Sequence, residues 1–356
     1  MEQKQLYALA CGFKLTGNII SITPFGEGHI NSTFLITTDK EQYIMQRINN
    51  YVFKDIDALM NNISLVTNFI KNKGKETIVL VSSKDDKLYV KYEGEYYRAY
   101  IFAKDTICYQ EVGDNLSLVD SLGSAFGELH HLLNDLDANK LVETIPNFHN
   151  TTKRYLDFLT ALHNAEPSKI KEAEKEIAYI KEHKDTYSVI TDAIKKGEIK
   201  NHVTHNDTKI NNVLFDKYTN KYRLVIDLDT VMPGSVLYDI GDAFRGLFTG
   251  NNEDNPDISL QKVNMPIYET FVKAYIGKMK NELNEKEVSL IPFSIYLMTI
   301  ECGMRFLADY LENNIYFATK YETHNLVRAR TQIALAEEVL KNIEELKKIA
   351  EDIYHA

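Results

Sequence analysis

The chain has 356 residues, of which 44% are hydrophobic and 26% charged, and its formal net charge is -10. These proportions are ordinary for a globular protein, and the length suffices for two lobes with sizeable cores. The negative charge argues against a nucleic-acid or anionic-membrane partner, although the same acidity would also keep a cytoplasmic protein soluble. We therefore expect a cytoplasmic enzyme that is a monomer or a small homo-oligomer.

Cysteine usage and hydropathy point the same way. The three cysteines are odd in number and far apart, which fits no zinc or disulfide framework and predicts reduced thiols: Cys11, Cys108 and Cys302. Residues 1–4 lack the charged-then-apolar pattern of a secretory signal. The longest apolar run, 288–300, is too short to span a bilayer, so we expect a buried core helix there.

The first hundred residues predict a small antiparallel sheet. Short strand-like segments separated by turn residues occupy 19–25, 33–37, 43–48, 78–81, 88–92 and 96–102. The turn Tyr92-Glu93-Gly94-Glu95 between the last two predicts a hairpin. One helix is expected at 55–71, where Lys73-Gly74 provides a stop signal.

After Phe102 the composition changes and helical periodicity dominates. Helices are predicted at 116–136, 152–165, 170–195, 266–283, 285–311 and 324–349. This order predicts an α+β fold with two lobes. The N-terminal lobe would comprise 1–102, the hinge 103–109, and the mainly helical C-terminal lobe 110–356.

The most informative stretch is His-Asn-Asp-Thr-Lys-Ile-Asn-Asn at 205–212. It places an acid at Asp207 and an amide at Asn212, and a buried strand at 224–226 then leads to a second acid, Asp227. Phosphoryl transfer from a metal-bound nucleotide needs one carboxylate to deprotonate the acceptor hydroxyl. It also needs an amide and a second carboxylate as oxygen ligands of Mg²⁺. The pattern predicts a kinase that uses ATP and Mg²⁺.

A competing interpretation treats His202, His205 and Asp207 as a transition-metal cluster, since their spacing permits it. No further ligand is obvious. This interpretation also leaves unexplained the strands at 213–215 and 224–226, whose hairpin would bring the amide and the second acid together. We therefore favour phosphoryl transfer.

The N-terminal lobe contains the turn Gly26-Glu27-Gly28-His29 between two predicted strands. Glycines let the backbone approach phosphates and present its N–H groups to them, although such a turn can also simply join strands. His29 could donate to an anion or hydroxyl, and an ordinary turn histidine is the alternative.

The third strand lacks the lysine with which kinase folds bind phosphates, and it carries Gln46 and Arg47 instead. Strand alternation puts these two side chains on opposite faces. A guanidinium suits phosphate oxygens, so we favour Arg47 as the cation. The following helix has Asn61 and Asn62 near its middle, where the partner acid is expected. Asp55 and Asp57 at its start are better explained as helix-capping and first-turn acids.

Charged residues follow the apolar helix near the C-terminus. Glu301 and Arg305 are four residues apart, hence on one helix face. Such a pair either binds to itself or lines a cleft, and both readings stay open. Arg328 and Arg330 point about 200° apart and cannot both face one pocket.

Together these blocks resemble the aminoglycoside phosphotransferase and choline kinase branch of protein-kinase-like folds, and more closely the N-acetylhexosamine 1-kinases. The catalytic part of the resemblance lies in 205–212, in Ile226-Asp227-Leu228-Asp229-Thr230-Val231-Met232-Pro233-Gly234 and in Leu237-Tyr238-Asp239-Ile240-Gly241-Asp242. Further blocks are 26–31, 46–49, 97–102, 304–307, 316–317 and 324–330.

The resemblance implies a bilobal kinase-like fold and ATP-dependent phosphorylation of an N-acetylhexosamine at O1. It implies that Asp207 is the base on the anomeric hydroxyl, that Asn212 and Asp227 hold Mg²⁺, and that His205 and Asp239 support the catalytic loop. Substrate contacts would come, besides the base, from His29, Asp229 and Arg305. Nucleotide contacts would come from Gly26, Gly28, Arg47, Phe102 and Ala103.

Two alternatives stay open. A kinase of the same fold could act on another small alcohol, such as an amino alcohol, a methylthio sugar, homoserine or an aminoglycoside. Acidic surroundings would favour an amine, whereas a mixed His, Arg and Asp pocket would favour a sugar. An inactive nucleotide sensor is a different class: the missing lysine permits it, whereas the intact Asp207, Asn212 and Asp227 argue against it.

Overall fold

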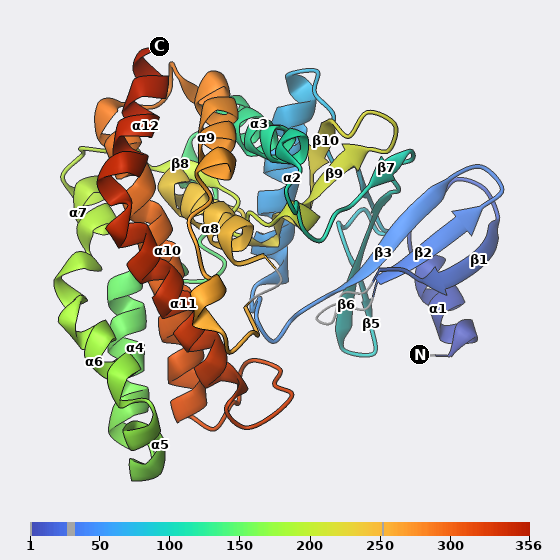
Figure 1. Ribbon diagram of the computed structural model, residues 1–356. Coiled ribbons are helices and arrows are strands. Elements are labelled where there is room, and N and C mark those ends of the chain that lie inside the picture. The colour runs from blue at the N-terminus through green and yellow to red at the C-terminus, as the bar shows by residue number, and fades with distance from the viewer. Residues whose placement is uncertain (1, 27–32, 251–252) are drawn as a thin grey trace.

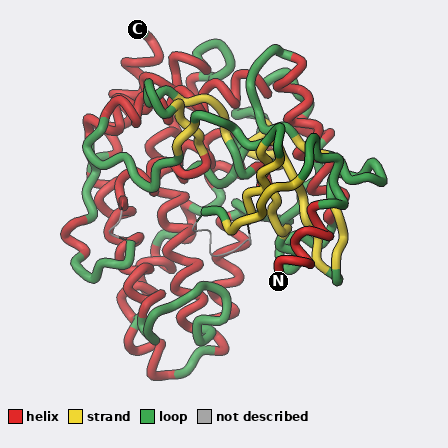
Figure 2. Tube along the Cα trace, turned by 90° about the vertical axis from the view of Figure 1, so that its right-hand side faces the viewer, coloured by secondary structure: helices red, strands yellow, loops and turns green. Residues whose placement is uncertain are grey.

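The structure, a computed structural model, describes residues 2–26, 33–250 and 253–356. Strands gather around the N-terminus at one side of the molecule, and helices form the larger body that ends at the C-terminus (Figure 1). The view from the side shows the N-terminal sheet toward the viewer and further strands among the helices (Figure 2). An N-terminal antiparallel sheet is thus followed by a mainly helical region, which confirms the predicted α+β class.

The N-terminal sheet has the strand order β1-β2-β3-β6-β4, and β5 pairs with β6. Its strands are β1 (Ile19–Pro24), β2 (Thr33–Thr38), β3 (Gln42–Ile48), β4 (Leu80–Val81), β5 (Val90–Tyr92) and β6 (Glu95–Ile101). All of these pairs are antiparallel. Glu93 and Gly94 join β5 to β6 with φ of 50° and 85°. Two positive φ values suit a tight hairpin, so the predicted turn is confirmed.

The two faces of this sheet have different neighbours. Tyr43, Met45 and Tyr97 pack with Leu9 of helix α1 (Gln3–Ala10) in a small core. We did not predict α1, whose eight residues bury only three side chains. Ile48, two residues after Gln46, belongs to the large core of the helical body. Because side chains alternate along a strand, Gln46 lies on the face toward the helical body.

Eleven further helices lie in the described part of the chain. They are α2 (Ile56–Asn72), α3 (Leu116–Leu133), α4 (Thr151–Asn164), α5 (Pro167–Glu172), α6 (Glu174–Glu182), α7 (Val189–Lys195), α8 (Val236–Thr249), α9 (Met265–Met279), α10 (Glu285–Leu311), α11 (His324–Lys341) and α12 (Ile343–His355). The single helix predicted at 170–195 is three short helices, and the one predicted at 324–349 is divided at Asn342.

Helix α10 is the centre of the helical body, where it packs against α4, α8, α11 and α12. Among the described residues it is the one helix long and apolar enough to cross a membrane, and 83% of its apolar stretch is buried inside the fold. Such burial is typical of a core helix. The expectation for 288–300 is therefore confirmed.

Two short sheets hold the loops that carry the motif acids. Strand β8 (His202–Thr204) pairs with β11 (Met232–Gly234), and β9 (Val213–Asp216) pairs with β10 (Tyr222–Val225) and with β7 (Thr106–Ile107). The β9–β10 pair confirms the predicted hairpin. Helix α2 packs into the large core. The hinge at 103–109 between the two predicted lobes stays a prediction.

Candidate active site

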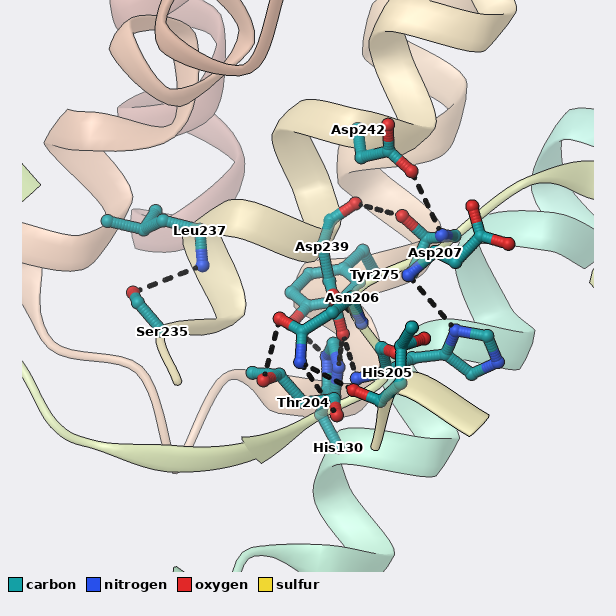
Figure 3. A network of polar contacts seen from close by, with 12 residues as sticks. His130, Thr204, His205, Asn206, Asp207, Ser235, Leu237, Asp239, Asp242 and Tyr275 are labelled. Atoms are coloured by element: carbon teal, nitrogen blue, oxygen red, sulfur yellow. Dashed lines mark hydrogen bonds and ion pairs between the residues drawn. The ribbon is translucent and has the colours of Figure 1, made fainter. Parts of the chain in front are cut away.

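The catalytic loop, residues 205–212, is anchored by Asp239 in the first turn of α8 (Figure 3). Its Oδ2 accepts from the backbone N–H of His205 at 2.7 Å, and its Oδ1 accepts from that of Asn206 at 2.6 Å. A carboxylate in the first helical turn is also stabilised by the helix dipole. The structure thus places both predicted supporting residues in contact with each other.

A buried histidine completes this anchor. His130 Nε2 lies 2.7 Å from Asp239 Oδ2, and His130 Nδ1 lies 2.6 Å from the hydroxyl of Tyr275. Burial would raise the pKa of Asp239, but the hydrogen bond and charge of His130 lower it overall. His130 escaped the sequence reasoning because its helix, α3, carries no motif.

Asn206 holds the loop in a strained conformation with φ of 64°. Its side-chain Nδ2 donates to the Thr230 carbonyl at 2.9 Å, and its own carbonyl lies 3.2 Å from Nε2 of His149. His149 Nδ1 is 2.9 Å from Glu301 Oε1. Glu301 therefore braces the catalytic loop through His149. Within the described residues it is buried and neither pairs with Arg305 nor lines a cleft, the two alternatives that its position in the sequence allowed.

Asp207 is held from both sides. Its Oδ1 lies 2.7 Å from Lys209 Nζ, and its Oδ2 accepts from Asn212 Nδ2 at 2.9 Å. Burial would raise the pKa of Asp207, but the Lys209 charge and these hydrogen bonds lower it overall. These contacts therefore favour the ionised form of the Asp207 carboxylate. The sequence reasoning missed Lys209, although a cation two residues after the acid was a readable signal.

The β9–β10 hairpin brings the predicted metal ligands together, since Ile226 N–H donates to the Asn212 carbonyl at 2.8 Å. Asn212 Nδ2 binds Asp207, which leaves its Oδ1 for a cation. Asp227 directly follows Ile226 and has φ of 58°. An amide oxygen beside a carboxylate fits Mg²⁺, which binds few protein groups and would neutralise charge on nucleotide phosphates.

The alternative metal cluster is not assembled. His202 lies 3.3 Å from Glu287, whereas His205 Nε2 lies 2.8 Å from the Ile226 carbonyl. Over residues 2–26, 33–250 and 253–356, no group of three His, Cys, Asp or Glu side chains is placed to hold a metal.

Binding of the magnesium–nucleotide complex is expected to weaken as the pH falls below about 6. Desolvation, followed by the charge of Asp229, raises the pKa of Asp227 to about 6, and a metal-ligating carboxylate must be ionised. Calorimetric titration with Mg²⁺–ADP at about pH 5.5 and pH 7.5 measures this loss. In Asp227→Asn, affinity should be low at both values; an unchanged pH dependence in that variant would contradict the assignment.

Asp229 is buried and carries an ion pair with Arg98, so its surroundings are not those of a free carboxylate. Arg98 is on β6, directly opposite Gln46 of β3. Arg47 follows Gln46 and thus lies on the other face, 3.9 Å from Glu95. The structure places Gln46, and not the favoured Arg47, on the side of the motif acids, because β3 turns its even-numbered residues toward the helical body.

The predicted nucleotide contacts are partly within the described residues. Gly26 has φ of 78° at the end of β1, and the neighbouring Phe25 meets Phe102 edge-on with ring centres 5.7 Å apart. Ala103 accepts a hydrogen bond from Thr106 at 2.7 Å. These aromatic edges adjoin the predicted hinge. Gly28 and His29 lie outside the described residues.

Arg305 is one helical turn beyond Glu301 on α10, and its guanidinium lies 5.5 Å from the ring centre of Phe317. Within the described residues, no hydrogen bond or ion pair joins Arg305 to Asp207 or Asp229. The two arginines of helix α11 make ion pairs elsewhere: Arg328 with Asp254 and Arg330 with Glu176. These ion pairs agree with the sequence-based argument that Arg328 and Arg330 do not both face one pocket.

Comparison with known proteins identifies the family. A model of the phosphotransferase enzyme family matches residues 21–264. An aminoglycoside phosphotransferase from Alicyclobacillus acidocaldarius is 12% identical with a TM-score of 0.66, covering 97% of this chain and 96% of its own. A microcompartment-associated aminopropanol kinase is 15% identical with a TM-score of 0.64, covering 96% and 98%.

A third structure, spectinomycin phosphotransferase in complex with ADP and spectinomycin, is 14% identical with a TM-score of 0.56, covering 97% of this chain and 99% of its own. These similarities show that the α+β fold is kinase-like. The family match extends over more than half of the chain and includes the catalytic loop, Asp227 and Asp239. The chain belongs to the phosphotransferase enzyme family.

Proposed function

We propose that the protein is an ATP-dependent kinase that phosphorylates an N-acetylhexosamine at O1 and releases the sugar 1-phosphate. The observation that carries the kinase chemistry is the Asp207 carboxylate, held between Lys209 and Asn212 in the loop that precedes Asp227. The identity of the acceptor is supported by the resemblance of the motif blocks to hexosamine 1-kinases.

The mechanism follows from the contacts of Asp207. An acceptor hydroxyl beside this carboxylate loses its proton to it as the oxygen attacks the γ-phosphorus in line with the departing ADP oxygen. Lys209, 2.7 Å from the carboxylate, offsets negative charge that develops on the phosphoryl group. Asn212 fixes the orientation of the carboxylate through Nδ2. Asp229 and Arg305 are the proposed sugar contacts in the described chain, with His29 as a third outside it.

A cavity lies beside the catalytic loop, which contributes Lys209, Ile210 and Asn211 to its lining. Its volume is about 820 Å³, within the usual range for small-molecule sites. Three acids and three bases line it: Glu111, Asp114, Glu253, Lys209, Arg245 and Lys262. Asp207, Asp229 and Arg305 are not among the residues that line it, so the choice of a sugar over an amine rests on the resemblance and not on this cavity.

A sugar whose anomeric oxygen is blocked separates O1 transfer from transfer to any other hydroxyl. We expect N-acetylglucosamine or N-acetylgalactosamine to support ADP formation with Mg²⁺, and the methyl glycoside of the same sugar to support none. Coupled ADP detection measures turnover, and ³¹P NMR identifies an acid-labile anomeric phosphate.

Choline, ethanolamine, homoserine, an aminoglycoside and free hexoses complete the acceptor panel. Turnover of the methyl glycoside, or faster turnover of an amine than of either hexosamine, would contradict the proposal. Absence of turnover with every acceptor, together with tight nucleotide binding, would instead favour the alternative in which the protein is an inactive nucleotide sensor.

A further inference from the structure

The ion pair that kinase folds place between the third strand and the next helix is missing here. Those folds pair a strand lysine with a helix glutamate, and this arrangement is needed for phosphate binding. Here Gln46 occupies the inward-facing position of β3. Asn62, near the middle of α2, donates to the backbone carbonyls of Val142 at 2.7 Å and Val231 at 3.1 Å. Neither half of the usual pair is present.

Arg98 on the neighbouring strand brings a positive charge to the same place. It is 3% exposed, and its guanidinium binds Asp229 through Nη1. Gln46 Oε1 accepts from Arg98 Nε at 3.1 Å and from Nη2 at 2.7 Å. The hydrogen bonds to Gln46 thus orient the guanidinium toward residues 227–229.

The hydrogen bonds of Arg98 leave part of its donor capacity unused. A guanidinium has five N–H groups, one on Nε and two on each Nη nitrogen. The three bonds to Gln46 and Asp229 use one group on each nitrogen. One N–H on each Nη nitrogen remains, and a guanidinium N–H can donate a charge-assisted hydrogen bond to a phosphate oxygen.

Charge balance also calls for a cation at this point. Asp207, Asp227 and Asp229 converge there, and the charge of Arg98 acts on Asp227 as well as on its direct partner Asp229. A buried arginine destabilises the folded protein unless its charge is paired. When no nucleotide is bound, Asp229 provides that pairing for Arg98. A nucleotide would add further negative charge against the same guanidinium.

We propose that Arg98 is the nucleotide-phosphate-binding cation of this kinase, supplied by β6 in place of the absent lysine of β3 and aimed by Gln46 and Asp229. The proposal rests on the nucleotide use of the proposed function but not on the identity of the acceptor. It predicts that phosphate affinity depends on Arg98, whereas Arg47 on the opposite face contributes little.

The test measures binding of the magnesium complex of a non-hydrolysable ATP analogue by calorimetry, with no acceptor present. We expect Arg98→Met to weaken binding at least about tenfold, since a charge-assisted hydrogen bond to phosphate is lost. Arg98→Lys should recover part of the affinity because it keeps the charge. Arg223→Met is the matched control, since it also removes an arginine from an ion pair. The partner of Arg223 is Glu76, which is more exposed than Asp229.

A purely structural role would give a different pattern. Arg98→Met leaves Asp229 unpaired, so its melting temperature should fall. The double variant Arg98→Met/Asp229→Asn removes both charges and should recover the melting temperature without recovering phosphate affinity. Parental affinity in that double variant would overturn the proposal, as would a loss of affinity in Arg47→Met but not in Arg98→Met. Failure of the acceptor panel would leave these binding results unaffected.

Discussion

Replacement of Asp207 by asparagine is expected to lower kcat by about 10²- to 10⁴-fold, the usual contribution of a general base. The amide keeps the shape of the side chain but cannot accept the proton of the acceptor hydroxyl. The amide N–H₂ must face one of the two donors, Lys209 or Asn212, so some stability is lost and a melting curve is needed to show that the variant is folded. Its KM for the acceptor should change far less than kcat.

Single-turnover measurements with a saturating hexosamine separate the chemical step from binding. Asp216→Asn is a suitable control. Asp216 ends β9 in the β9–β10 hairpin, and its side chain accepts hydrogen bonds from the backbone N–H groups of Tyr218 and Thr219. Its kcat should stay within about twofold of the parent, as expected for a surface substitution. A parental rate in Asp207→Asn would remove this residue from the role of base.

The second large effect is expected at Asp239, on stability as well as on activity. Its carboxylate accepts from two backbone N–H groups and from His130 while buried to 1% exposure. Asparagine would turn an N–H₂ group toward one of these donors. Loss of one partner from a buried charged network costs about 3–5 kcal/mol, so the free energy of unfolding should fall by this order.

The pH dependence provides an independent measure of Asp239. Its pKa in the folded protein is below the ordinary value. Its contribution to stability is therefore present at neutral pH and is lost as the pH falls below about 4, through the unfolded and then the folded pKa. Urea unfolding at neutral pH and at about pH 3.5 should show a smaller difference between Asp239→Asn and the parent at the lower pH.

Asp242→Asn is the control for Asp239. Asp242 accepts from Thr208 N–H at 3.1 Å and pairs with Arg245, but it contacts neither His205 nor Asn206. We expect it to destabilise the protein less than Asp239→Asn does. Equal losses of stability in the two variants would show that the anchor is not specific to Asp239.

Local patterns in the sequence were sufficient for most of the fold. The strands of the first lobe and the helices at 116–133 and 285–311 were predicted because alternation and helical periodicity are properties of consecutive residues. Helix α1 was missed because it is short and buries few side chains. The region 170–195 was read as one helix because its charge pattern does not reveal the two interruptions.

Within the candidate site, the sequence alone determined the acid and amide of the catalytic loop. Asp207 and Asn212 are five residues apart, so the geometry of one loop brings them to 2.9 Å. The hairpin that carries Asp227 was equally readable from the strands on either side of it. Spacing along the chain is sufficient where the chain itself makes the contact.

Only the tertiary structure decided which cation meets these acids. Arg98 and Asp229 are 131 residues apart, and His149 and Glu301 are 152 apart. Whether Gln46 or Arg47 faces the helical body depends on how the sheet docks against it, since alternation alone makes the two faces equivalent. Docking is set by burial of Ile48 and α2 in the large core, a long-range packing effect that no local pattern encodes.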